Sequence, residues 1–355
     1  MSATNQAAMK EKYIRIDKVS LDNCDFSKTI LMLMVILQHS LNFWNKGWFI
    51  YEPQNKSVIL SNISSFLSTI HVCTFTIISG YIFCYKMMNG DYKNIKIFVT
   101  KKIKRLLVPL LFVSVVWAIP IGYLFYKWDI STIFHKFILC ESPSQLWFLL
   151  MLFEVSILAR FTWRILKKND IYSWAMVFSL WLIGKAGHGF SPNYYVIWTS
   201  CEYFLYFYLG ITLRQKDYMT TFMFRYLLVW PILCLAFFCL ANIVKQSTGL
   251  ISKLSMMPIN LLLTITAGIS AFRLLTVIGN RINWHNKHFN NLSRHSMPMY
   301  LFHQQIVYFL IVMFDGINPY LHALLIFVFV VIISYFISYI CMKNKITRIL
   351  IGVNG

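Results

Sequence analysis

Charged residues are scarce in this sequence, and acidic ones are the scarcest. Asp, Glu, Lys and Arg make up 13% of the 355 residues, against roughly 25% in an average soluble domain. Only 13 residues are acidic, and 58% of the chain is hydrophobic. A soluble fold of this length needs a charged surface that so few residues cannot provide, and a disordered chain would not be this apolar. The composition therefore indicates a protein with many membrane spans.

Signals for secretion and for soluble appendages are also missing. Residues 1–27 are polar and contain no apolar core next to a cleavage site, so we expect the first span to direct insertion. Of the eight cysteines, only Cys140 falls in an expected external loop, which excludes an extracellular disulfide framework. We predict one membrane domain over 28–341, between a cytoplasmic N-terminal segment (1–27) and a cytoplasmic tail (342–355).

Apolar segments long enough to cross about 30 Å of hydrocarbon recur along the chain. They predict an all-α, polytopic membrane protein with about ten transmembrane helices. The expected spans are 28–44, 63–85, 106–126, 145–163, 171–184, 196–213, 223–243, 257–278, 297–314 and 320–341.

The distribution of basic residues predicts which side of the membrane each loop faces. With the N-terminus inside, 26 of the 33 Lys and Arg residues fall at inner loops and inner helix ends, and 7 fall at outer ones. Cytoplasmic loops carry the excess of Lys and Arg in membrane proteins, so both termini are predicted to be cytoplasmic. Because the basic residues lie between apolar runs, we expect no nucleic-acid partner despite the net charge of +20.

Five of the ionisable side chains inside the expected spans are candidates for a functional site. Each costs about 2.5–3.5 kcal/mol on insertion scales and is therefore a candidate functional residue. Glu202 lies near an outer helix end, where water reaches it, whereas counting along the helices puts the other four near mid-membrane. A chamber between helices would hold all four, although packing as a neutral side chain is the alternative for any one histidine. The four are His39, His71, Glu154 and His303.

Two sets of basic residues lie at the expected cytoplasmic surface. Lys28 and His39 are eleven residues apart, about three helical turns, so their side chains share one helix face. Lys101 and Arg105 are four apart and also share a face, and with Lys102 they form a compact basic patch. Such a patch suits an anionic lipid headgroup or a polyphosphate ligand. Ordinary anchoring of helix ends is the alternative for both sets.

In combination, these segments resemble the membrane-bound acyltransferase 3 family, best known for bacterial O-acetyltransferases that modify glycans. The resemblance covers about residues 22–341. Many members carry arginine at the position of Lys28, so the charge is kept here but a bidentate phosphate contact is lost. The matching motifs are Lys28 to His39, His71 to Ser79-Gly80-Tyr81, Lys101 to Pro109, Leu146-Trp147-Phe148-Leu149, and Tyr300-Leu301-Phe302-His303.

The resemblance implies a donor, an acceptor and a location. Acetyl-CoA or another acyl-CoA would dock from the cytoplasm, with its phosphates on the basic residues. Its acyl group would move to a hydroxyl of a cell-envelope glycan or lipid-linked sugar, among the lipids of the bacterial inner membrane. Ser79-Gly80-Tyr81 would shape the chamber or supply a hydroxyl. The expected donor-binding residues are Lys28, Lys101, Lys102, Arg105, Ser79, Gly80 and Tyr81, and no metal is expected.

A sugar hydroxyl needs a base when it attacks a thioester, and histidine suits that role at neutral pH. His39 is the expected general base, and a covalent acyl-histidine relay is the alternative when donor and acceptor lie on opposite membrane faces. His71, Glu154 and His303 are expected as further members of the site. The competing function is export of a polysaccharide or glycolipid, because proteins with many spans and buried polar residues are frequently transporters.

Overall fold

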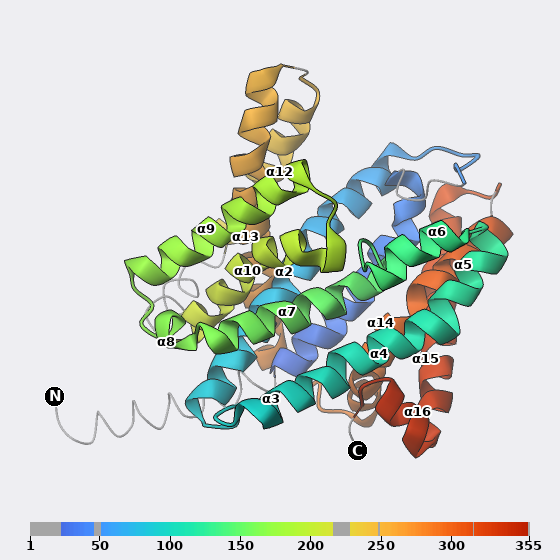
Figure 1. The fold of residues 1–355 in the computed structure, drawn as a ribbon. Coiled ribbons are helices and arrows are strands. Elements are labelled where there is room, and N and C mark those ends of the chain that lie inside the picture. Colours follow the sequence, from blue (N-terminus) through green and yellow to red (C-terminus); the bar gives the residue numbers. More distant parts are fainter. Residues whose placement is uncertain (1–22, 46–50, 216–227, 248, 315, 354–355) are drawn as a thin grey trace.

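The computed structural model describes residues 23–45, 51–215, 228–247, 249–314 and 316–353 (Figure 1). All regular elements in these ranges are helical, which confirms the predicted all-α class. Residues 23–41 form the first described helix, which continues as the 3-10 turn η1 (Asn42–Asn45).

Helices follow one another with short connections. A rod of three helices is continuous because the π-helical segments η2 (Ile103–Leu107) and η3 (Ser114–Ala118) join its parts. The bounds in chain order are α2 (Val58–Met88), α3 (Ile95–Lys102), α4 (Val108–Val113), α5 (Ile119–Tyr126), α6 (Ile130–Ile133), η4 (Phe134–Ile138), η5 (Ser144–Leu146), α7 (Trp147–Phe161), α8 (Trp163–Leu166), α9 (Ile171–Phe190), η6 (Tyr194–Val196), α10 (Ile197–Gln215), α12 (Val229–Lys245), α13 (Leu250–Arg281), α14 (Lys287–Met313), α15 (Pro319–Lys343) and α16 (Lys345–Leu350).

Several helices begin at a side-chain cap. Asp170 precedes α9 and accepts hydrogen bonds from the backbone N–H and the hydroxyl of Ser173, at 2.9 and 2.8 Å. These bonds favour the ionised carboxyl group, so the pKa of Asp170 is held below its ordinary value. Asp129 caps α6 in the same way, by accepting from the N–H of Thr132.

Six helical segments of the described chain are long and apolar enough to cross a membrane. They coincide with six of the ten predicted spans, and they are Val58–Met88, Ile95–Tyr126, Ser144–Phe161, Tyr194–Gln215, Leu254–Arg281 and Pro319–Lys343. The predicted span 171–184 falls within α9, 297–314 falls on α14 up to its last residue, Met313, and 28–44 falls largely on the first helix. The predicted span 223–243 begins outside the described residues and continues in α12, which is 17 residues long. The total of ten and the cytoplasmic termini stay predictions.

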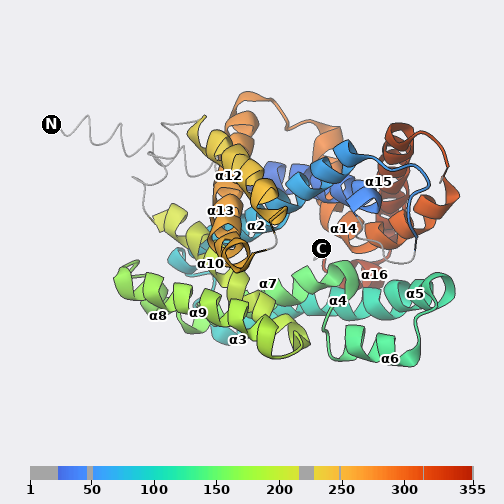
Figure 2. The same ribbon diagram turned by 90° about the horizontal axis from the view of Figure 1, so that it is seen from above.

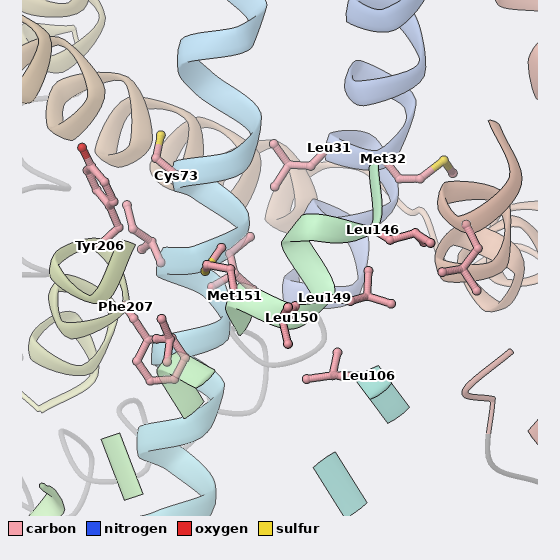
Figure 3. Packing of buried hydrophobic residues seen from close by; sticks show 14 of the residues in the cluster. Leu31, Met32, Cys73, Leu106, Leu146, Leu149, Leu150, Met151, Tyr206 and Phe207 are labelled. Carbon is pink, nitrogen blue, oxygen red and sulfur yellow. The ribbon is translucent and has the colours of Figure 1, made fainter. Parts of the chain in front are cut away.

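Helix α2 occupies the centre of the molecule. Seen from above, α3 to α9 lie along one side, α12 to α15 lie on the other, and α2 and α10 lie between them (Figure 2). Side chains of the first helix, α7 and α10 converge on α2 in the buried core (Figure 3). This core contains Leu31, Met151 and Phe207, each fully buried. The central position of α2 places its polar residues next to several other helices.

Two glycines allow α2 and α10 to cross in close contact. A Cβ atom built on Gly80 would lie 1.9 Å from the carbonyl oxygen of Phe207, and one built on Gly210 would lie 2.0 Å from that of Ile77. Each glycine therefore contacts the backbone of the opposite helix, which is the usual role of small residues between membrane helices.

The last described helix, α16, returns the chain to the rod of α3 to α5. Pro109 has no N–H and cannot donate to the carbonyl of Arg105. A Cβ atom built on Gly352 would lie 2.8 Å from this oxygen and 2.7 Å from Cγ of Pro109, and Gly352 has a φ of +75°. Residues of the predicted tail therefore pack beside the predicted basic patch, at the lower edge of Figure 1 where α3 and α16 lie.

Candidate active site

Two predicted histidines meet between the first helix and α14. Nε2 of His303 lies 2.8 Å from Nδ1 of His39, and the two rings are stacked with their centroids 4.8 Å apart. His303 is fully buried, and His39 is partly buried. Residues that are far apart in the sequence thus form one hydrogen-bonded imidazole pair.

The hydrogen-bond network assigns a tautomer to each ring of the pair. Nδ1 of His303 lies 2.6 Å from the carbonyl oxygen of Tyr300, and a carbonyl only accepts, so this nitrogen carries the proton. The Nε2 atom of neutral His303 is then an acceptor, and Nδ1 of His39 donates to it. In neutral His39 the basic lone pair is consequently on Nε2. A histidine oriented through its other nitrogen is the arrangement that general-base catalysis uses.

His71 of α2 is the third histidine of this region. It is 5% exposed, and it lies close enough to His39 and His303 to interact electrostatically with both. Among the described residues, neither of its ring nitrogens has a hydrogen-bond partner. A buried polar group without a partner is costly, so His71 is available to a ligand that enters the site. The described residues contain no group of three or more His, Cys, Asp or Glu side chains arranged for a metal ion.

The loop before α7 holds the His303 segment of α14 in place. Nε2 of Gln145 donates to the carbonyl of Leu301 at 2.7 Å and to Oε1 of Gln305 at 2.8 Å. The hydroxyl of Tyr300 donates to the backbone carbonyl of Gln145. These bonds clamp the turn of α14 that presents His303. Gln145 is not among the predicted site residues, because a single neutral glutamine at the end of an expected span carries no signal of its own.

Glu154 lies apart from the three histidines in its contacts. This side chain of α7 lies beside Ser200 and Cys201 of α10 and near Cys140. Its Oε2 atom is buried without a hydrogen-bond partner in the described part of the chain. The predicted chamber therefore unites His39, His71 and His303, while Glu154 forms a separate polar position.

The predicted basic patch divides into two kinds of residue. Lys101 and Arg105 are exposed, as a surface for a phosphate group requires. Lys102 turns inward, where its Nζ atom donates to Oγ of Ser156 at 3.0 Å and lies 5.7 Å from the centroid of the Phe98 ring. Lys28 remains near the surface and forms an ion pair with Asp25 at 3.0 Å.

In the Ser79-Gly80-Tyr81 motif, the contacts of Gly80 and Tyr81 account for these two residues. Gly80 lies against α10, whereas Ser79 is partly buried on another face of α2. Tyr81 is 5% exposed and accepts a hydrogen bond from Arg214 at 3.4 Å.

Arg214 is a cation that sequence reasoning counted only as one of many inner basic residues. Its guanidinium group lies 5.5 Å from the centroid of the Tyr81 ring and 5.2 Å from that of Tyr85. It also lies close enough to Cys24 to interact electrostatically, which places it near the first helix. Its position at the end of α10, opposite two tyrosines, is evident only once α2 and α10 are packed together.

Comparison with known proteins gives one match. The family model described as an acyltransferase domain matches residues 21–343. No curated protein and no solved structure matches the chain.

Proposed function

The chain belongs to the acyltransferase 3 family, and on that premise we propose that it transfers an acyl group from acyl-CoA to a hydroxyl of a cell-envelope glycan or glycolipid. The apolar helices support an acyltransferase that works in the membrane. The proposed setting is the bacterial inner membrane, with both termini in the cytoplasm and acetyl-CoA as the favoured donor.

The single observation that carries the proposal is the hydrogen bond between His39 and His303. The acceptor hydroxyl attacks the thioester carbonyl, and Nε2 of His39 takes the hydroxyl proton as the new ester bond forms. His303 stabilises the charge that His39 then carries, because its Nε2 accepts the hydrogen bond from Nδ1 of His39. The carbon–sulfur bond breaks, and the departing CoA thiolate takes the proton back from His39. An acyl-histidine relay would use the same nitrogen as nucleophile.

The donor would be held by the exposed basic residues at the proposed cytoplasmic surface. Lys101 and Arg105 are free of ion pairs among the described residues, so they can bind phosphate groups by charge-assisted hydrogen bonds. Lys28 lies on the same helix as His39, and the thioester would then reach inward along this helix. Lys102, bound to Ser156, supports the segment from within.

The direct test is mass spectrometry of envelope glycans from cells with and without the protein. We expect an acyl substituent, of 42 mass units in the case of acetyl, that is present only when the protein is produced. Glycans that differ in amount at the cell surface but not in acylation would contradict the proposal and favour export.

A further inference from the structure

A second polar site lies on the opposite face of α2 from the histidines. A cavity of about 230 Å³ opens between α2, α9, α10 and α13. Thr69 and Cys73 of α2 line it. His71 is two residues from each of them, about 200° around the helix, so it points to the other side. We call this cavity the Glu202 pocket after its only carboxylate among the described lining residues.

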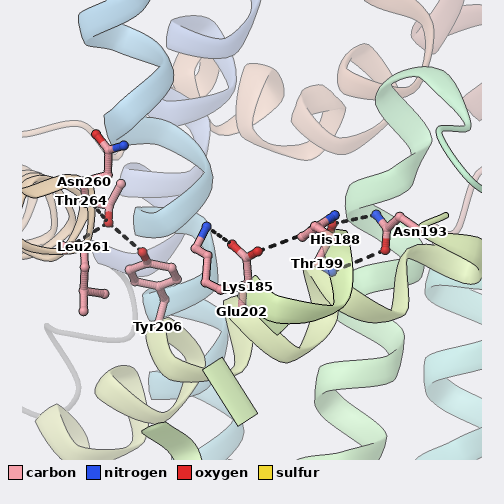
Figure 4. Close-up of polar contacts among 9 residues, drawn as sticks. All are labelled: Lys185, His188, Asn193, Thr199, Glu202, Tyr206, Asn260, Leu261 and Thr264. Carbon is pink, nitrogen blue, oxygen red and sulfur yellow. Dashed lines mark hydrogen bonds and ion pairs between the residues drawn. The ribbon is translucent and has the colours of Figure 1, made fainter. Parts of the chain in front are cut away.

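An ion pair is held in the wall of this pocket. Oε2 of Glu202 lies 2.5 Å from Nζ of Lys185, and Oε1 lies 3.2 Å from Nε2 of His188, so that two side chains of α9 flank one of α10 (Figure 4). The glycines of α9 make this approach possible. A Cβ atom built on Gly184 would lie 2.8 Å from Cγ of Glu202. The side chain of Glu202 is 13% exposed, so this carboxylate is largely buried.

The rest of the lining presents hydroxyl groups, an amide and ring faces. The hydroxyl of Tyr206 lies 2.6 Å from that of Thr264, which itself donates to the carbonyl of Asn260 (Figure 4). The rings of Trp181 and Tyr203 complete the wall. Ring faces with hydroxyls, an amide and a charge-neutral ion pair suit a neutral ring that carries many hydroxyls: its C–H faces pack on the aromatics and its hydroxyls bond to the polar groups.

A row of aromatic rings leads from the pocket to the histidine pair. Consecutive ring centroids are 5.5 to 6.2 Å apart, and the four rings between the ends are each partly exposed. The row runs Tyr206, Tyr203, Trp147, Phe148, Tyr300 and His303. It therefore joins two polar sites that α2 otherwise separates.

We propose that the Glu202 pocket is a distal subsite of the acceptor and that the aromatic row carries the chain between this subsite and His39. This proposal rests on the proposed function and narrows it: the acceptor is a neutral glycan chain of several sugar units. One hydroxyl-rich ring sits in the pocket while a different ring of the same chain presents its hydroxyl at the histidine pair. A cavity of 230 Å³ is below the size of a typical drug-sized site, which agrees with one ring and not with a whole chain.

The test measures binding without chemistry. Neutral oligosaccharides released from the envelope of producing cells are labelled with a fluorophore at the reducing end and separated into single sugars and longer chains. Their binding to the full-length His39→Ala protein in nanodiscs is measured by fluorescence polarisation. We expect longer chains to bind, and Glu202→Gln in this background to weaken that binding about tenfold or more, because a hydrogen bond to a charged group is lost.

Matched variants separate the pocket from general effects. Glu141→Gln removes a carboxylate that pairs with His135 at 3.4 Å outside the pocket, and it should leave binding unchanged. Thr264→Val keeps the side-chain shape and removes one hydroxyl of the pocket, so it should weaken binding severalfold. It tests the pocket independently if the Glu202→Gln protein does not fold. Trp147→Ala interrupts the row and should weaken binding of longer chains more than of single sugars.

The outcomes distinguish this subsite from the reaction itself. Equal binding of longer chains to the Glu202→Gln and parent proteins, or no binding of any chain to the parent, would overturn the subsite. If chains bind in a Glu202-dependent manner but the wild-type protein transfers no acyl group, the subsite stands and the proposed reaction fails. If the wild-type protein acylates glycans while Glu202→Gln and Thr264→Val neither weaken binding nor lower the rate, the reaction stands and the subsite fails.

Discussion

The histidine pair (His39 and His303) and the Glu202 cluster (Glu202 with Lys185 and His188) are both polar groups enclosed by helices, yet they are stabilised differently. His303 bonds to an imidazole and to the backbone carbonyl of Tyr300. Glu202 bonds instead to two basic side chains, Lys185 and His188. The first group is held by neutral partners, whereas the second is held by a lysine of opposite charge together with an imidazole.

This difference separates two roles. A carbonyl partner fixes the tautomer and orientation of an imidazole without adding charge, so the ring can take up a proton and release it during a reaction. A lysine partner fixes the position of a carboxylate by charge attraction, so the group can act by holding a ligand. We therefore propose proton transfer for the histidine pair and ligand binding for the Glu202 cluster.

After loss of His39 itself, the largest effect that tests this comparison is expected from loss of the second histidine. His303→Ala removes the acceptor for Nδ1 of His39 and should lower the rate of acyl transfer about 10²-fold. His288→Ala changes an exposed histidine of the same helix and should have no effect. Initial rates with labelled acyl-CoA provide the measurement. A His303→Ala rate within twofold of wild type would remove the pair from the mechanism.

Charge reversal at the basic patch should have the next largest effect. Lys101→Glu combined with Arg105→Glu should raise the KM for acyl-CoA roughly tenfold, because two carboxylates that repel the phosphates would replace two exposed cations that attract them. The wild-type KM should also rise with salt. Lys56→Glu, in a predicted outer loop, is the control. It changes the net charge by the same amount as each of these two substitutions and should leave the KM for acyl-CoA unaltered. A double variant with an unchanged KM but poor insertion would support simple anchoring.

Depth along the helices and short motifs predicted a chamber with four polar residues, and the structure brings its three histidines together. His39 and His303 are 264 positions apart in the sequence, and their rings meet between the first helix and α14. The motif Ser79-Gly80-Tyr81 was expected to shape the chamber, and the structure shows that its glycine lies against the backbone of Phe207.

The residues that sequence could not place depend on how helices rotate and on where loops return. Glu154 is at the expected depth on α7, but it faces Ser200 and Cys201. Gln145 acts from the short 3-10 turn η5, and its partners on α14 lie more than 150 positions away. The depth of a residue along its helix can be predicted by counting residues in the sequence. The side chain that it faces depends on how the helices pack together, and this cannot be counted from the sequence.

A moderate loss of stability is expected from a substitution in the part of α9 that contacts Glu202. Gly184→Ala would place a Cβ atom 2.6 Å from the carbonyl oxygen of Trp198, so α9 must shift away from α10. Overpacking of this kind costs about 1–3 kcal/mol of unfolding free energy. Gly189→Ala, where nothing lies within 4 Å of the added atom, is the matched control. Thermal unfolding in detergent compares the two, and equal stabilities would contradict the close α9–α10 contact.

The sidedness of the membrane domain can be tested without changing activity. Single cysteines at Asn94 and at Lys56, in a background that lacks reactive native cysteines, should label differently. Asn94→Cys should react with an impermeant maleimide only after permeabilisation, whereas Lys56→Cys should react in intact cells. Labelling of Asn94→Cys from outside would reverse the predicted topology and the cytoplasmic entry of the donor.

The most direct test of acyl transfer at the histidine pair is the rate of the His39→Ala protein with labelled acyl-CoA and the envelope glycan. Wild-type and variant proteins would be compared in nanodiscs, once equal unfolding temperatures and equal binding of acyl-CoA have shown that the variant is folded. We predict a loss of transfer of about 10²- to 10⁴-fold, which is the usual contribution of a general base. Transfer by His39→Ala at the wild-type rate would contradict the assignment.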